Sequence, residues 1–228
     1  MNDSKKARRV IDTFTGPWEK RNLPKMAAAL PHWVTSDHLT LLGILAALVI
    51  AAGYLLAWYS RWWLWLSNFG LLVHWYADSL DGTLARVRHR EREKYGYFVD
   101  HVCDAWAALV IFLGLGASSL MDMRVALFMT VSYYLLSIYV HIAAYTEGVF
   151  RISYVRIGPT EMRMFICAVN IVLVFWNPLV TTVRGFPMTA LDIGGIFVSI
   201  LLIGNTIVCS IKSAIKLDRQ DRAKWKER

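Results

Sequence analysis

Cysteine is scarce in this sequence. The 228 residues include only Cys103, Cys167 and Cys209, and all three fall inside predicted helices. An odd number of scattered cysteines argues against a disulfide framework and against a zinc site. The sequence shows no internal repeat or low-complexity segment, and its first 38 residues are too polar for a cleavable signal peptide, so we expect none.

Charged residues are rare within six long apolar runs, although 56% of all residues are hydrophobic. A helix of roughly 20 apolar residues is long enough to cross the hydrocarbon core of a bilayer. The sequence therefore predicts an all-α integral membrane protein with six transmembrane helices. The predicted spans cover residues 39–58, 62–84, 97–120, 123–146, 161–182 and 189–211.

Six spans leave no room for a separate soluble domain. We expect a cytoplasmic interfacial segment at 1–38, a six-helix membrane domain at 39–211 and a charged cytoplasmic tail at 212–228. Within the first segment, basic residues precede apolar ones, which is typical of a short amphipathic helix lying in the membrane interface. These residues are Lys5, Lys6, Arg8 and Arg9, followed by Val10, Ile11 and Phe14.

Basic residues are distributed unevenly between the two ends of the predicted helices. Only Arg61, Arg124 and Arg184 lie between the first and second, third and fourth, and fifth and sixth spans. The positive-inside rule therefore places both termini and the 85–96 loop in the cytoplasm. This topology, together with anionic lipid at the cytoplasmic face, accounts for the net charge of +8. A nucleic-acid surface would instead require a basic patch on a soluble fold.

Four aspartates lie within one stretch of 27 residues, DSLDGTLARVRHREREKYGYFVDHVCD. We call Asp78, Asp81, Asp100 and Asp104 the four motif aspartates. Offsets of three or four residues put two of them on one face at the end of one helix and two on one face at the start of the next. Ionised carboxylates near hydrocarbon are costly without a cation or a function. Their convergence predicts a site for two hard divalent cations with oxygen ligands.

The residues between the two aspartate pairs support this hypothesis. Gly82 and Ala85 are small, which would allow a ligand to approach the backbone closely, and Arg86 follows within a turn of Asp81. The structural alternative is an ion-pair network at the helix ends, with Arg86, Arg88 and Lys94 as partners of the aspartates.

The complete motif resembles the signature of the CDP-alcohol phosphotransferase family of membrane enzymes. This resemblance implies transfer of a phosphoalcohol from a CDP-activated donor to an alcohol acceptor, with Mg²⁺ or Mn²⁺ held by the four motif aspartates. It also implies that Asp78, Gly82, Ala85 and Arg86 border the CDP moiety, and that the protein forms a homodimer. One departure is Ser36-Asp37, where the family usually carries a Pro-Asn pair.

A second stretch, from His141 to Phe165, is similar to choline and ethanolamine phosphotransferases, as is the string DHVCD at Asp100 to Asp104. The resemblance implies that His101 and Glu161 deprotonate the acceptor alcohol. Asp104 is the alternative base, and His101 is alternatively a packing residue that orients an aspartate. His74 and His141 have apolar neighbours and are expected to be packing residues.

Two substrate assignments within this family stay open. In the first, a CDP-linked polar head group is transferred to diacylglycerol or a similar lipid alcohol, which His101 and Glu161 favour. In the second, CDP-diacylglycerol is the donor and a small alcohol such as inositol phosphate is the acceptor, which Arg151, Arg156 and Arg163 favour because such a cluster suits a phosphorylated ligand.

Two other classes of protein compete with an enzyme. A cation transporter would carry ionisable residues deep within several helices, whereas these aspartates lie beside one basic loop. An inactive scaffold with the same fold is the remaining alternative, and the intact motif argues against it. The family resemblance, together with the short six-helix form, implies a prokaryotic inner-membrane enzyme, and the charge distribution predicts that its active site faces the cytoplasm.

Overall fold

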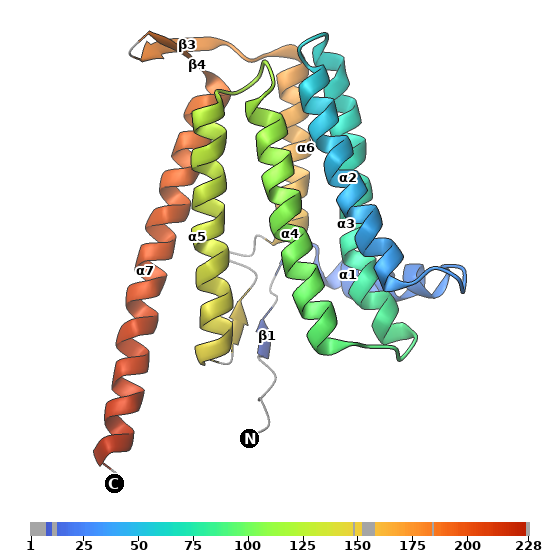
Figure 1. Ribbon diagram of the computed structural model, residues 1–228, viewed down its shortest axis with the longest axis vertical. Coiled ribbons are helices and arrows are strands. Elements are labelled where there is room, and N and C mark those ends of the chain that lie inside the picture. Colours follow the sequence, from blue (N-terminus) through green and yellow to red (C-terminus); the bar gives the residue numbers. More distant parts are fainter. Residues whose placement is uncertain (1–7, 11–12, 148, 152–157, 184, 227–228) are drawn as a thin grey trace.

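A bundle of long helices dominates the computed structural model, which describes residues 8–10, 13–147, 149–151, 158–183 and 185–226. Six helices run side by side, and α1 lies across one end of the bundle (Figure 1). The helices are α1 (Gly16–Ala28), α2 (Ser36–Leu56), α3 (Leu64–Val87), α4 (Glu93–Gly116), α5 (Met123–Glu147), α6 (Pro159–Phe175) and α7 (Ala190–Lys226), with a 3-10 turn η1 at Arg61–Trp63.

Four short strands complete the described structure. Strand β1 (Arg8–Val10) pairs in parallel with β2 (Val149–Arg151), and β3 (Leu179–Val183) forms an antiparallel hairpin with β4 (Phe186–Thr189). The hairpin lies at the opposite end of the bundle from β1 and from the loop that joins α3 to α4 (Figure 1).

Small residues allow the central helices to pack closely. A Cβ atom added to Gly70 of α3 would lie 3.0 Å from the backbone nitrogen of Ile50 on α2. A Cβ added to Gly114 of α4 would lie 2.7 Å from the Cα of Ala51. Close backbone approach at small residues is a common way to join helices in membranes, where apolar surface alone provides little attraction. The α2, α3 and α4 backbones are thereby fixed relative to one another.

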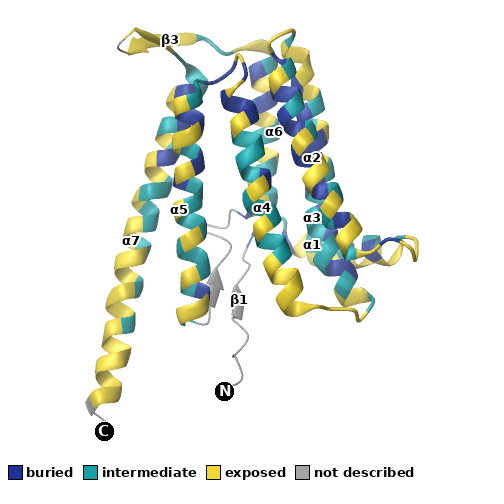
Figure 2. Ribbon diagram, in the orientation of Figure 1, coloured by how far each residue is buried: buried dark blue, intermediate teal, exposed yellow. Residues whose placement is uncertain are grey.

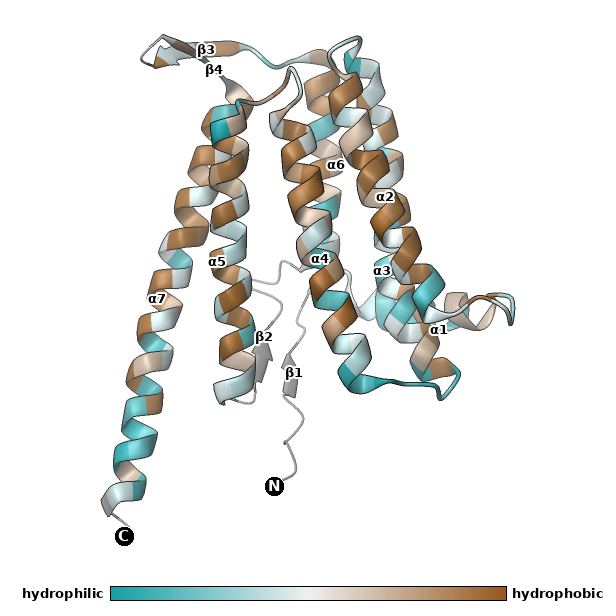
Figure 3. Cartoon of the chain, viewed as in Figure 1, coloured by the Kyte–Doolittle hydropathy of each residue, from teal (hydrophilic) through white to brown (hydrophobic). Residues whose placement is uncertain are grey.

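Among the described residues, four helices are long and apolar enough to cross a membrane, namely α2, α4, α5 and α7. Their outward faces carry exposed apolar side chains (Figures 2 and 3), which identifies a membrane protein. The other two predicted spans correspond to α3, which carries Asn68, His74, Asp78 and Asp81, and to α6, which has only 17 residues. Length and apolarity therefore bear out four of the six predicted spans.

Two details differ from the expectations drawn from the sequence. Arg8–Val10 is a strand, so this part of the predicted interfacial helix is extended, and the N-terminal helix begins at Gly16. The fifth predicted span ends at Phe175 because Pro178 disfavours helical backbone at Asn177. The charged tail is a helical continuation of α7, which extends to Lys226.

Side-chain caps hold the ends of the bundle. Thr35 caps α2, and its side chain accepts a hydrogen bond from the amide of His38. At the opposite end, buried Asp192 accepts hydrogen bonds from the amides of Asp122 and Thr189. Arg124 donates to both carboxylate oxygens of Asp122 and thereby lowers the pKa of that carboxyl group.

Candidate active site

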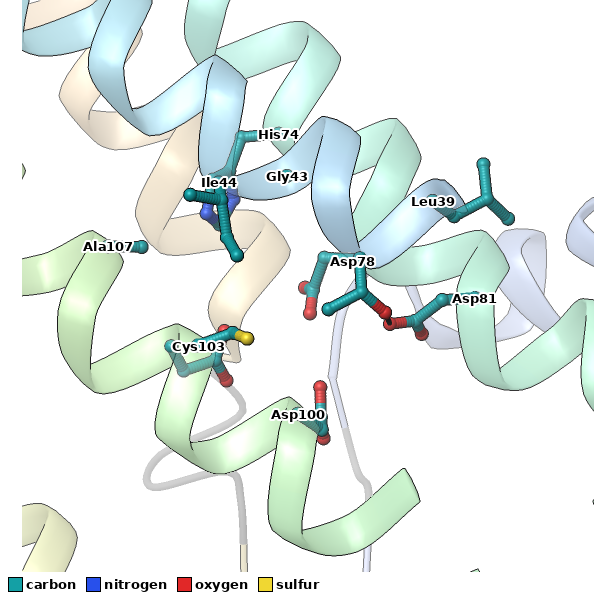
Figure 4. Close-up of a pocket in the computed structure, with 11 residues that line it drawn as sticks. Leu39, Gly43, Ile44, His74, Asp78, Asp81, Asp100, Cys103 and Ala107 are labelled. Atoms are coloured by element: carbon teal, nitrogen blue, oxygen red, sulfur yellow. Dashed lines mark hydrogen bonds between the residues drawn. The ribbon is translucent and has the colours of Figure 1, made fainter. Parts of the chain in front are cut away.

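The four motif aspartates line a single pocket between α2, α3 and α4. Asp78 and Asp81 come from the last turns of α3, and Asp100 from the early turns of α4 (Figure 4). Asp104 follows Asp100 on α4. All four are half-buried. The loop between α3 and α4 reverses the chain, so the two same-face pairs predicted from the spacing lie opposite one another. The predicted convergence is confirmed.

Asp78 forms an ion pair with a residue from α6. Its Oδ2 accepts a hydrogen bond from Nη2 of Arg163 at 2.6 Å, with side-chain exposures of 25% and 16%. Two of the three partners named by the network alternative, Arg86 and Arg88, have other contacts. Arg86 donates to the hydroxyl of Thr83 at 2.9 Å, and Arg88 donates to backbone carbonyls in the connection between α1 and α2. In the described part of the chain, Arg86 and Arg88 therefore do not form the predicted ion-pair network with the aspartates.

Asp81 is fixed by its own backbone and by α2. Its carboxylate accepts hydrogen bonds from the amide of Gly82 and from the hydroxyl of Thr40, the latter at 3.2 Å. The hydroxyl of Ser36 donates to the Asp81 carbonyl at 2.8 Å. These contacts orient the carboxylate towards the pocket. They also place Ser36, the first residue of the Ser-Asp departure, directly against the motif.

Asp100, His101 and Asp104 form a compact group on α4. One possible ligand atom from each lies within 4.8 Å of the others. Nδ1 of His101 lies 3.6 Å from Oδ2 of Asp100. The His101 ring meets the ring of Tyr97 edge-on, with centroids 4.2 Å apart, and lies 4.4 Å from the ring of His141 on α5. His101 is thus held by aromatic neighbours beside the predicted metal ligands.

The chemistry of this group of side chains suits a hard divalent cation. Four carboxylates from two helices supply oxygen ligands of the type that Mg²⁺ and Mn²⁺ prefer. Thr40, Arg163 and the Gly82 amide fix individual carboxylates in orientation, which is the usual task of groups around a metal site. The single Arg163 guanidinium offsets only part of the negative charge of four carboxylates.

The residues predicted to border the nucleotide all lie on α3. Asp78 lines the pocket, while Gly82, Ala85 and Arg86 follow it on the last turns of α3. Gly82 and Ala85 are half-buried, and Arg86 is exposed. A Cβ added to Gly82 would lie 3.4 Å from Nη1 of Arg86, so a larger residue would crowd the guanidinium.

Glu161 occupies a structural position. One carboxylate oxygen accepts hydrogen bonds from the amide and hydroxyl of Thr15 at 2.7 and 2.8 Å, and the other accepts from the amide of Gly158 at 2.9 Å. Glu161 thus caps α6 and fastens the chain just before α1 to it. Neither Glu161 nor His101 is among the residues that line the aspartate pocket. Its role as a base stays a prediction.

Other predicted residues have unexpected surroundings. His74 is buried, as expected of a packing residue, but it also lines the aspartate pocket. His141 contacts the rings of His101 and Tyr97 and shares a 3.1 Å hydrogen bond with the Tyr97 hydroxyl. Arg156 and the side chain of Arg151 lie outside the described residues. The proposed arginine cluster is therefore represented here by Arg163 alone.

Sequence reasoning missed Thr40 and Tyr97 and did not pair Arg163 with Asp78. Thr40 lies on α2, outside the motif, and no local pattern marks it. Tyr97 could have been found, because it precedes His101 by one helical turn and so lies on the same face. Arg163 is 85 residues from Asp78, and only helix packing brings the two together.

Comparisons with known proteins agree with this geometry. A family model described as CDP-alcohol phosphatidyltransferase matches residues 33–207. The chain is also similar to a phosphatidylinositol phosphate synthase of Cutibacterium acnes, with 30% identity over 105 residues. That alignment covers 46% of this chain and 48% of the relative, so the chain spans about half the length of the curated relative it matches.

Proposed function

The chain belongs to the CDP-alcohol phosphatidyltransferase family, and from this premise we propose that it is a phospholipid-synthesis transferase that releases CMP from a CDP-activated donor. In this reaction the acceptor hydroxyl oxygen attacks the phosphorus that carries the transferred alcohol. A new P–O bond forms, the bond to the bridging pyrophosphate oxygen breaks, and CMP leaves with that oxygen. The observation that carries the proposal is the convergence of the four motif aspartates in one pocket.

The four motif aspartates are our proposed ligands for two Mg²⁺ or Mn²⁺ ions. When bound, such ions neutralise the diphosphate and stabilise the charge that develops on the departing CMP. A hydrogen bond from Arg163 orients the carboxylate of Asp78, and a hydrogen bond from Thr40 orients that of Asp81. Gly82, Ala85 and Arg86 border the nucleotide, where small side chains leave room for it and the guanidinium supplies positive charge.

His101 is our proposed acceptor of the proton from the attacking hydroxyl. Its ring lies beside Asp100 and Asp104, and an imidazole is well suited to take up a proton near neutral pH. Tyr97 and His141 restrict the ring from two sides. Asp104 is the alternative base. The contacts of Glu161 support a positioning role, because both of its oxygens are already engaged.

Two specific observations favour different substrates. The placement of His101 in the aspartate group supports transfer of a CDP-linked polar head group to diacylglycerol or a similar lipid alcohol. The similarity to a phosphatidylinositol phosphate synthase supports the second assignment, with CDP-diacylglycerol as donor and a phosphorylated polar alcohol as acceptor. Both assignments use the same pocket, and both require one glycerolipid and one water-soluble substrate.

The arrangement in the membrane follows from the same features. We propose that α3 and α6 cross the bilayer with the other four long helices, and that the aspartate pocket faces the cytoplasm of a prokaryotic cell. The basic residues of the loop between α3 and α4, beside the pocket, support this orientation. A homodimer stays a prediction from the family resemblance.

A test of the function measures CMP release by the purified protein in detergent with Mg²⁺ or Mn²⁺. CDP-choline, CDP-ethanolamine and CDP-diacylglycerol are crossed as donors with diacylglycerol, inositol phosphate, glycerol phosphate and serine as acceptors. Release from a CDP-linked head group with diacylglycerol supports the first assignment, and release only from CDP-diacylglycerol supports the second. No release from any pair would overturn the proposed transferase and favour transport or a scaffold.

A further inference from the structure

His74 is a buried polar side chain that faces the pocket. The residue is 8% exposed, and its imidazole forms no hydrogen bond within the described part of the chain. The ring points from α3 into the pocket that the four motif aspartates line (Figure 4). Buried polar groups in folded proteins nearly always have a hydrogen-bond partner. The ring nitrogens of His74 are not themselves enclosed by protein atoms, so a ligand atom in the pocket can supply the missing hydrogen-bond partner.

The pocket changes character along its length. His74 precedes Asp81 by seven residues on α3, so it lies roughly 10 Å further from the basic loop along the helix axis. The other lining residues at this depth are Gly43, Ile44 and Ala107, none of which has a polar side-chain atom. The lining beyond the carboxylates is therefore apolar apart from His74, although the charges of Asp78 and Arg163 act on its imidazole. The end near the loop carries the carboxylates, together with Thr40 and Cys103.

The apolar end also reaches the outer surface of the bundle. Ile44 lines the pocket and is nevertheless 36% exposed. Leu41, Leu45 and Leu48 lie on the same face of α2 and are more exposed still. Because α2 is long and apolar enough to cross a membrane, this face borders lipid. An apolar ligand therefore has a short route from the bilayer to the inner end of the pocket.

We propose that His74 hydrogen-bonds an oxygen of the glycerol backbone of the lipid substrate. This inference rests on the proposed function, in which one of the two substrates is a glycerolipid. In such a lipid, hydroxyl or ester oxygens lie between the reacting end and the acyl chains, as His74 lies between the carboxylates and the apolar lining. A neutral imidazole offers one donor and one acceptor nitrogen, so it can pair with an ester carbonyl or with a hydroxyl.

His74 is thus a lipid-binding residue that sets how deeply the lipid enters. The same contact serves diacylglycerol as acceptor and CDP-diacylglycerol as donor, because both carry the glycerol backbone. The water-soluble substrate binds at the carboxylate end and does not reach His74. Loss of the imidazole should therefore weaken binding of one substrate and not of the other.

The experiment measures CMP release in mixed micelles, with the surface fraction of the glycerolipid and the concentration of the soluble substrate varied separately. The substrate pair is the one that the wild-type protein uses. We expect His74→Leu, which fills the space without hydrogen bonding, to raise the KM for the glycerolipid about 10-fold. The KM for the soluble substrate should change less than about twofold. His74→Gln, which keeps a donor and an acceptor, should restore most of the loss.

Tyr54→Phe is the matched control, because it removes a buried hydroxyl that bonds Asn170 away from the pocket. It should leave both KM values unchanged. An unchanged glycerolipid KM in His74→Leu, or an equal change in both KM values, would overturn the role of His74 while leaving the transferase intact. If His74→Leu does not fold, the KM for the glycerolipid is compared between His74→Gln and His74→Asn. The shorter side chain of asparagine should lose the contact, so the proposal expects a higher KM for His74→Asn, and equal KM values would overturn it.

A binding measurement separates this inference from the proposed function. Native mass spectrometry would compare retention of diacylglycerol and of CDP-diacylglycerol by wild-type protein, His74→Leu and Tyr54→Phe. A selective loss of either lipid in His74→Leu supports the glycerolipid contact and identifies which lipid is bound. Equal retention by all three proteins would overturn it. If the wild-type protein releases no CMP from any pair, the proposed function fails, and this measurement still decides the role of His74.

Discussion

Arg163 on α6 donates a 2.6 Å hydrogen bond to Asp78 on α3, and both side chains are largely shielded from water. The pair connects the first aspartate of the motif to a helix that the motif does not include. Shielding strengthens the attraction, and removal of one partner leaves the other charge uncompensated. Arg163 therefore both orients Asp78 and limits the repulsion among the four motif aspartates.

Loss of Arg163 should impair catalysis more than folding. We expect Arg163→Ala to lower kcat about 10- to 100-fold, the range seen when a group that orients a metal ligand is removed. Arg163→Lys should be intermediate, because it keeps the charge without the planar guanidinium. Steady-state CMP release is the measurement. Arg124→Ala, which breaks an exposed ion pair with Asp122 at the other end of the bundle, is the control. Activity of Arg163→Ala within twofold of wild type would contradict the prediction.

Metal removal should abolish activity reversibly. Treatment with a chelator is expected to stop CMP release, and added Mg²⁺ or Mn²⁺ should restore it, because the four motif aspartates are the proposed ligands of hard divalent cations. Asp100→Asn should raise the metal concentration needed for half-maximal activity at least about 10-fold. Electron paramagnetic resonance of bound Mn²⁺ checks the affinity without turnover. Asp37→Asn, in an exposed pair with Arg92, should bind Mn²⁺ normally. Full activity in chelator would exclude metal dependence.

The position of Glu161 predicts a stabilising role that can be separated from proton transfer. Glu161→Ala removes the acceptor of hydrogen bonds from Thr15 and Gly158, so we expect the free energy of unfolding to fall by about 1–3 kcal/mol. Thr15→Ala should destabilise less, and the double variant should be less destabilised than the sum, because the two residues contact each other. Denaturation in detergent is the measurement. A Glu161→Gln variant of normal stability that has lost kcat would instead support the base assignment.

Replacement of His101 tests the proposed base directly. We expect His101→Asn to lower kcat about 10²- to 10⁴-fold, the usual contribution of a positioned general base. Tyr97→Phe keeps the ring contact but loses the hydrogen bond to His141, so its effect should be smaller. Single-turnover measurement of CMP formation isolates the chemical step. His89→Ala, on the exposed loop, should behave as wild type. Retention of near-normal rates by His101→Asn would transfer the role to Asp104.

Several features of the fold were predictable because they depend on neighbouring residues. The approximate ranges of the long helices follow from continuous apolar runs. The end of α6, seven residues before the end of the predicted span, also has a local cause in Asn177-Pro178. The prediction missed it because the surrounding residues are apolar and continue the run. The strand at Arg8–Val10 was not predictable in this way, because it pairs with Val149–Arg151, more than a hundred residues away.

The sequence by itself determined that four carboxylates share a site, because helical periodicity and one short loop fix their relation within 27 residues. Only the tertiary structure decided what surrounds them. Arg163 reaches Asp78 because α6 packs on α3, and Thr40 reaches Asp81 because small residues bring α2 against α3. Glu161 accepts hydrogen bonds from Thr15, 146 residues away, and does not line the aspartate pocket. Contacts between distant segments depend on how helices pack, and no local pattern in the chain encodes that packing.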